Sequence, residues 1–504
     1  MSETSQNPPR PPPPDDDPAA GLARNAFFLV LGQVATTALA IFFNAALGRT
    51  LGAQDFGLYF LLTTMSTFAY VIAEWGQSLF VTRQVAREPE RSGTLLGTAI
   101  ALRAASALLL PGLTWVIAWL LGYDVRTQRF APAFVIANLP FFLSQAFSLF
   151  FRGRDRMGDD ASISVTNKAL AFVIALPALA LGAGIYGVVG AQTAAGVAAL
   201  GLAYVLYRRF HGLPLRSSAA TARELIAGGT PILAMSAAVS VQPYLDAIIL
   251  SKLVPAVAVG WFGAAKAILG TLTTAAAILG TAAYPRLSRA ADDHVAFVRE
   301  IRTALRPMLW LGALCGTGTF LFAKPVVALI YGSSGFGPAA VILQVFAPGM
   351  FLLFLDILLA SVVYAYGAAR GFAVVKILSV LVSSVLDFVL VPIFQSRYGN
   401  GGIGVVVAFA ASEFVVFPGA LLILRREKLG SGMGVDMLRA LGAAGGTIGL
   451  FAAAPALPWY LGIPACLVFF TGASLALGLV SRSELSVLWS MLRRRRAPAV
   501  IEPP

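Results

Sequence analysis

The chain has 504 residues, of which 58% are hydrophobic and only 12% charged, and its net charge is +13. A mean hydropathy of +0.79 excludes a soluble globular protein, because a soluble fold of this length could not bury so much apolar surface. The basic excess does not indicate a nucleic-acid partner, since Lys and Arg gather in every second loop. The sequence therefore predicts an all-α polytopic membrane protein.

The chain begins with a Pro-rich, acidic segment, residues 1–22, which we expect to be a disordered cytoplasmic tail. Residues 482–504 are expected to form a basic cytoplasmic tail. About fourteen apolar segments of spanning length lie between the tails. We expect helices at roughly 24–48, 57–82, 94–121, 131–151, 162–182, 187–207, 226–251, 259–284, 305–323, 341–364, 371–394, 402–424, 436–458 and 461–481.

The basic residues predict the orientation of these spans. Most of them fall in loops that lie on one side when both termini are cytoplasmic, including the run Arg493 to Arg496. The opposite loops carry few basic residues: Arg49, Arg126, Arg129, Lys252, Lys324 and Arg397. We therefore expect a protein of the bacterial inner membrane with cytoplasmic termini. Because all outer loops are short, a membrane glycan polymerase or ligase is disfavoured.

An internal repeat divides the spans into two halves. Three residues of the first half have a counterpart 203 residues later in the chain. Arg49 corresponds to Lys252, Gly57 to Gly260 and Arg83 to Arg286. Six spans separate the copies, so both halves point the same way across the membrane. This predicts two six-helix lobes, 23–210 and 225–425, related by a parallel pseudo-two-fold axis. Residues 436–481 would add two further helices outside the repeat.

Several segments resemble the polysaccharide flippases of the multidrug/oligosaccharidyl-lipid/polysaccharide exporter superfamily. They are Gly48–Tyr59, Thr82–Arg87, Tyr284–Leu287 and Gly399–Gly404, with Ser412 and Glu413 further on. The resemblance implies two lobes around a central cavity. It also implies a non-enzymatic transporter that moves undecaprenyl-pyrophosphate-linked O-antigen or exopolysaccharide units from the inner to the outer leaflet. Polysaccharide polymerase and chain-length proteins would be its partners.

Two related alternatives remain open at this point. Lipid II flippases share these motifs. A multidrug/cation antiporter would share the twelve-helix core but should have an acidic pocket for cationic drugs. No cofactor or metal is expected, because Cys315, Cys466, His211 and His294 are scattered along the chain.

Ionisable residues inside the predicted spans are the candidate functional residues, since such groups normally face a bundle interior or a wet cavity. They are Glu74, Arg103, Asp246, Lys266, Asp356, Lys376, Asp387 and Glu413. Asp246 and Lys266 lie at similar depth on adjacent antiparallel spans. They are expected either to pair with each other or to serve transport. In the second case Lys266 would bind the cargo pyrophosphate, and Asp246 would be its resting counterion or carry a coupling cation.

Two arginines are candidates for the cargo phosphate, because a guanidinium matches phosphate oxygens. Arg24 opens the first span and is equally suited to anchor it at the membrane interface. Arg103 lies deeper, in the third span. The acids are assigned to the cavity or to H⁺ or Na⁺ coupling: Glu74 to the cavity, Asp246 to both, and Asp356, Asp387 and Glu413 to coupling.

Overall fold

The computed structural model describes residues 18–210, 213–332, 335–424, 432–453 and 457–481. Most of the two expected tails lies outside these ranges. Every regular element in the described part is helical, which confirms the all-α prediction. The helices are α1 (Pro18–Glu74), α2 (Gln77–Arg87), η1 (Pro89–Arg91), α3 (Ser92–Leu120), α4 (Val125–Gly153), α5 (Met157–Ala180), α6 (Gly184–Phe210), α7 (Ala219–Ser240), α8 (Gln242–Leu253), α9 (Ala256–Ala290), α10 (His294–Tyr331), α11 (Gly337–Ala365), α12 (Ala369–Tyr398), α13 (Gly402–Leu424), α14 (Met433–Ala453) and α15 (Trp459–Ala476).

Twelve of the described helices are long and apolar enough to cross a membrane. The difference from the expected fourteen has two structural causes. The first expected span and most of the second, 57–82, belong to one helix, α1, which bends in its middle, while the last residues of the second fall in α2. The seventh expected span, 226–251, is divided into α7 and α8, and neither piece alone is long and apolar enough. Pro243, in the first turn of α8, has no N–H for a helical bond and favours this break.

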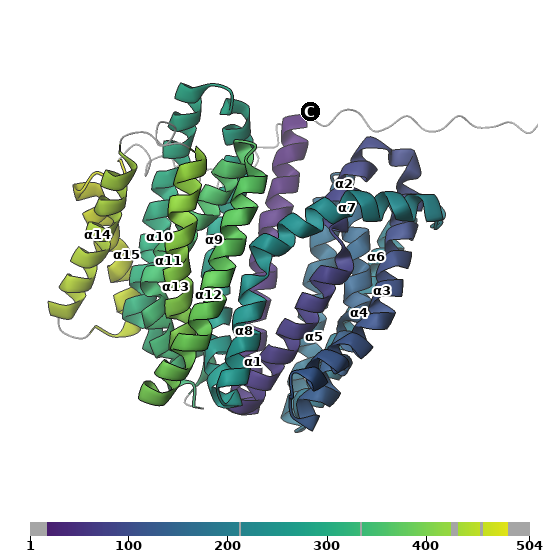
Figure 1. The fold of residues 1–504 in the computed structure, drawn as a ribbon, viewed down its shortest axis with the longest axis horizontal. Coiled ribbons are helices and arrows are strands. Elements are labelled where there is room, and N and C mark those ends of the chain that lie inside the picture. The colour runs from purple at the N-terminus through teal and green to yellow at the C-terminus, as the bar shows by residue number, and fades with distance from the viewer. Residues whose placement is uncertain (1–17, 211–212, 333–334, 425–431, 454–456, 482–504) are drawn as a thin grey trace, which may run out of the picture.

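The bend in α1 occurs at Gly52, whose backbone has φ 71° and ψ 174°. This conformation is open to glycine and costly for residues with a Cβ atom. The bend lets the second part of α1 return toward α2, as Figure 1 shows. One helix therefore supplies two antiparallel walls of the first lobe.

The helices pack as two lobes with a small addition at one side (Figure 1). We call α1 to α6 the N-terminal lobe and α8 to α13 the C-terminal lobe. Helices α14 and α15 pack on α10, away from the N-terminal lobe. Helix α7 crosses from the C-terminal lobe to α2 and α3 of the N-terminal lobe. Two glycines permit this close crossing, because a methyl group on Gly76 or Gly229 would overlap the backbone of the other helix.

The lobes meet directly where α1 crosses α9, near the predicted outer face. A Cβ atom at Gly57 would overlap the carbonyl oxygen of Ala256, and one at Gly260 would overlap that of Ala53. The two contacts are equivalent in the repeat, because Gly260 follows Gly57 by 203 residues and Ala256 follows Ala53 by the same offset. The paired glycines thus lie across the axis that relates the lobes. Their missing side chains let the two helix backbones touch.

This crossing predicts a stability difference between two glycines of α9. Gly260→Leu should lower the free energy of unfolding by about 1–3 kcal/mol, because the new side chain must displace α1 backbone. Gly270→Leu is the control, since nothing lies within 4 Å of a Cβ atom there. Thermal unfolding of the purified variants in detergent measures both effects. Equal unfolding temperatures for the two variants would contradict the tight crossing.

Candidate functional site

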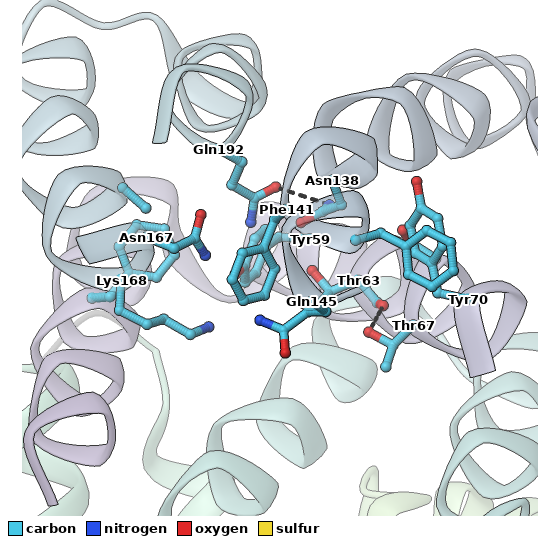
Figure 2. A pocket seen from close by; sticks show the side chains of 14 residues that line it. Tyr59, Thr63, Thr67, Tyr70, Asn138, Phe141, Gln145, Asn167, Lys168 and Gln192 are labelled. Carbon is cyan, nitrogen blue, oxygen red and sulfur yellow. Dashed lines mark hydrogen bonds between the residues drawn. The ribbon is translucent and has the colours of Figure 1, made fainter. Parts of the chain in front are cut away.

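A cavity of about 260 Å³ lies within the N-terminal lobe (Figure 2). Its wall is built by α1, α4, α5 and α6, so it depends on the return of α1 after Gly52. The lining residues are Phe43, Tyr59, Thr63, Ser66, Thr67, Tyr70, Asn138, Phe141, Phe142, Gln145, Asn167, Lys168, Ala171 and Gln192.

The lining combines amide side chains with aromatic rings. Asn138, Gln145, Asn167 and Gln192 each carry both a donor and an acceptor group. Asn138 is held in place by hydrogen bonds that its Nδ2 donates to the Phe134 carbonyl oxygen (2.8 Å) and to Gln192 Oε1 (3.4 Å). Such groups suit a ligand rich in hydroxyls, and the rings offer flat apolar faces beside them. No lining residue is a carboxylate.

Lys168 is the single charged residue in this lining. Its ammonium group extends into the same space as the Gln145 amide (Figure 2). In the described part of the chain, Lys168 has neither an ion-pair nor a hydrogen-bond partner. An unpaired cation in a cavity within the lobe is a ready site for an anionic group of a ligand.

The sequence-based candidates omitted Lys168, although a usable signal was present. It lies inside the expected span 162–182, as the other ionisable candidates lie inside theirs. The neutral lining residues gave no comparable signal, because Asn, Gln and Tyr are common in helices. Only the packing of α4, α5 and α6 around α1 brings them together.

Arg103 and Glu74 lie behind the cavity wall rather than in it. The Arg103 side chain is 1% exposed and donates from Nη1 to the Phe142 carbonyl oxygen (3.1 Å) and from Nε to Gln77 Oε1 (3.2 Å). Its Nη2 lies 3.6 Å from Glu74 Oε1. Glu74 in turn accepts a hydrogen bond from the Ser78 amide at the start of α2. In this arrangement the pair joins α3 to α1, α2 and α4.

Arg103 is therefore predicted to contribute to stability. Arg103→Ala should lower the free energy of unfolding by about 3–5 kcal/mol, because Glu74 and two oxygen acceptors lose their buried cation. Thermal unfolding in detergent tests this, with Arg83→Ala as a control at an exposed position of α2. A variant with unchanged stability but weakened cargo binding would contradict the structural role and favour the ligand role.

The C-terminal lobe contains two groups of three charged residues. In the first, Asp246 of α8, Lys266 of α9 and Asp387 of α12 lie within electrostatic range of one another. The expected direct ion pair between Asp246 and Lys266 does not form within 4.0 Å. Asp246 and Asp387 are 2% and 0% exposed, and among the described residues neither oxygen of Asp387 has a hydrogen-bond donor. Two adjoining buried carboxylates would repel each other unless they share a proton or a cation.

The second group joins Asp356 of α11, Lys376 of α12 and Glu413 of α13. Lys376 Nζ lies 2.6 Å from Asp356 Oδ2 in a buried ion pair. Glu413 is 4% exposed and interacts electrostatically with both partners, but its Oε1 has no hydrogen-bond donor. Each group therefore contains two carboxyl groups and one lysine.

Two further expectations concern Arg24 and metal ions. Arg24 falls near the start of α1, but its side chain lies outside the described residues. Among the residues that the structure describes, no three His, Cys, Asp or Glu side chains gather as a metal site. In the second charged group, Lys376 pairs directly with Asp356.

Comparisons with known proteins agree with this architecture. The family model described as polysaccharide biosynthesis protein matches residues 22–291. The chain is 24% identical over 425 residues to the putative O-antigen transporter of Escherichia coli (strain K12), covering 81% of this chain and 98% of that protein.

Solved structures resemble the chain in fold. One is the lipid II flippase MurJ in an inward closed conformation, with a TM-score of 0.68, 14% identity, and coverage of 93% of this chain and 100% of that one. Another is an inward-facing multidrug resistance MATE family transporter of the MOP superfamily, with a TM-score of 0.61 and 14% identity, covering 80% and 98%. At such low identity these likenesses concern the fold alone.

Proposed function

The chain belongs to the polysaccharide biosynthesis protein family, and from this premise we propose that it is a flippase for lipid-linked oligosaccharides. The family and its transporter relatives confirm the expected class, a transporter rather than an enzyme. The proposed cargo is an undecaprenyl-pyrophosphate-linked O-antigen or exopolysaccharide unit. The lobes would expose the cargo first to the inner leaflet and then to the outer leaflet of the bacterial inner membrane, with both termini in the cytoplasm.

The composition of the N-terminal cavity is the observation that carries this proposal. Amides, hydroxyls and aromatic rings are suited to sugar hydroxyls and ring faces, and Lys168 is suited to a phosphate. A multidrug antiporter would instead need acidic groups for cationic drugs, and the lining contains none. A cavity of about 260 Å³ would enclose only part of a large cargo, near the polar end of the lipid. Lipid II remains a related cargo with the same diphosphate.

We assign cation coupling to the two charged groups of the C-terminal lobe. Each group holds two carboxyl groups and one lysine, so full ionisation would leave one uncompensated negative charge in each. A proton removes that charge without the five or six oxygen ligands that a sodium ion prefers. We therefore favour H⁺ as the coupling ion, carried by Asp246 or Asp387 in one group and by Glu413 in the other.

Lys168→Ala tests the cargo site. In a strain without the chromosomal gene, this variant should restore surface polysaccharide at least about tenfold less than the parent, because the diphosphate loses its cation. Lys168→Arg should retain part of the activity. Lys324→Ala is the matched control, since Lys324 is an exposed residue of α10 outside the cavity. Surface glycan on gels, at equal protein levels, gives the readout, and full activity of Lys168→Ala would contradict the assignment.

Asp387→Asn tests the coupling assignment. In proteoliposomes that carry lipid-linked oligosaccharide, transport by the parent should accelerate when a pH gradient is imposed. The variant should lose this acceleration, because the amide cannot bind and release the proton. Asp292→Asn, at an exposed carboxylate between α9 and α10, should behave as the parent. Acceleration by a sodium gradient, and not by a pH gradient, would reject the proton.

The cargo itself is tested by deleting the gene. Trapped undecaprenyl-linked units in the inner leaflet and loss of surface polysaccharide would support the flippase. Intact polysaccharide with new sensitivity to cationic compounds would favour the multidrug antiporter. We also propose that the polysaccharide polymerase and chain-length proteins act on the cargo after its release.

A further inference from the structure

The outer ends of the two lobes are joined by a reciprocal pair of cationic side chains. Arg49, on α1 of the N-terminal lobe, donates hydrogen bonds to the carbonyl oxygens of Leu329 and Ile330 in the last turn of α10. Lys252, on α8 of the C-terminal lobe, donates to the carbonyl oxygen of Gly122 just beyond α3 (3.4 Å). Each lobe thus places one cation on backbone carbonyl groups of the other, at the end of α10 and in the turn after α3.

The acceptors explain why cations are used at these positions. The last four carbonyl groups of an α-helix have no partner within the helix, and the helix dipole places partial negative charge there. Arg49 therefore stabilises the end of α10, whereas Lys252 binds a carbonyl group of the turn that follows α3. Lys252 also lies 4.2 Å from the ring centre of Tyr123, where the ring face attracts a cation.

The two cations occupy equivalent positions in the repeat. Lys252 follows Arg49 by 203 residues, the same offset that separates Gly260 from Gly57. The α1–α9 crossing at the two glycines and the two cationic contacts therefore form one symmetric set at the outer face. Uncharged contacts also join the lobes there, such as the 2.6 Å hydrogen bond between Tyr123 and Ser251 and the packing of Phe56 on Tyr331.

We propose that Arg49 and Lys252 are paired gate residues that hold the outer face closed and separate when cargo leaves toward the outer leaflet. Both side chains are exposed, so water can replace them on the carbonyl groups when the lobes part. The contacts therefore bias the gate toward closure without locking it. The proposal rests on lobe movement during the proposed transport cycle, but it makes no assumption about the cargo.

Distance measurements between the outer ends of the lobes test this gate. Spin labels are placed at Leu181 after α5 and at Tyr398 at the end of α12, which are 87% and 67% exposed. The background lacks both native cysteines through Cys315→Ala and Cys466→Ala. Double electron–electron resonance spectroscopy on the full chain in nanodiscs, without cargo, then gives the distribution of distances between the two labels.

The double variant R49A/K252A should shift this distribution toward longer distances, and each single variant should shift it less. R49K/K252R should restore the parent distribution, because it keeps a donor on each side. Arg126→Ala is the matched control, since Arg126 is also an outer-face arginine but pairs with Asp55 of its own lobe (2.8 and 3.2 Å).

The outcomes separate a gate from a general structural role. A distribution unchanged in R49A/K252A, or shifted equally by Arg126→Ala, would overturn the proposal. If R49A/K252A folds poorly, R49Q/K252Q is measured by the same criterion with its unfolding temperature as a check. Failure of the gate test leaves the polysaccharide assays unaffected, and failure of those assays leaves the measured distances valid.

Discussion

Hydrocarbon neither solvates charge nor hydrogen-bonds to backbone, and this constraint determines where each ionisable group lies in the molecule. Arg103 meets the constraint with Glu74, Gln77 and a backbone carbonyl. The pair of Lys376 and Asp356 meets it by direct contact. Groups that remain unsatisfied are therefore informative. Within the described residues, Lys168 is an exposed cation in the cavity without a protein partner, and the buried Asp387 carboxyl has no hydrogen-bond donor.

These unsatisfied groups are distributed unequally between the lobes. The cavity of the N-terminal lobe is lined by uncharged polar and aromatic side chains and one lysine. The interior of the C-terminal lobe instead holds four carboxyl groups and two lysines. Two lobes with the same helix order thus carry different chemistry. The proposed transport cycle uses this difference, since anionic cargo and coupling protons would otherwise compete for the same groups. The two lobes contact each other directly where α1 crosses α9.

Much of the fold follows from sequence, because apolar length and basic loops are local properties. The repeat of Gly57 at Gly260 predicted two lobes related by an axis, although not that the two glycines would touch. The break between α7 and α8 was harder to predict, because Pro243 is compatible with either a kink or a new helix. The site was predictable only in part. The similar depth of Asp246 and Lys266 in adjacent spans predicted that they lie near each other. The position of Asp387 beside them could not be predicted, because it depends on how α12 packs against α8.

The contact between Gly57 and Gly260 has a consequence for the history of such a chain. In a half-length ancestor that assembled as a symmetric pair, each glycine would have faced its own copy across the axis. One mutation would then have changed both subunits together, so a new side chain at that position would have contacted the same side chain of the partner subunit. After the halves were joined in one gene, each side was free to change alone. Arg49 and Lys252, at equivalent positions of the two halves, fit such divergence, because the charge is kept in both halves while the chemical group differs.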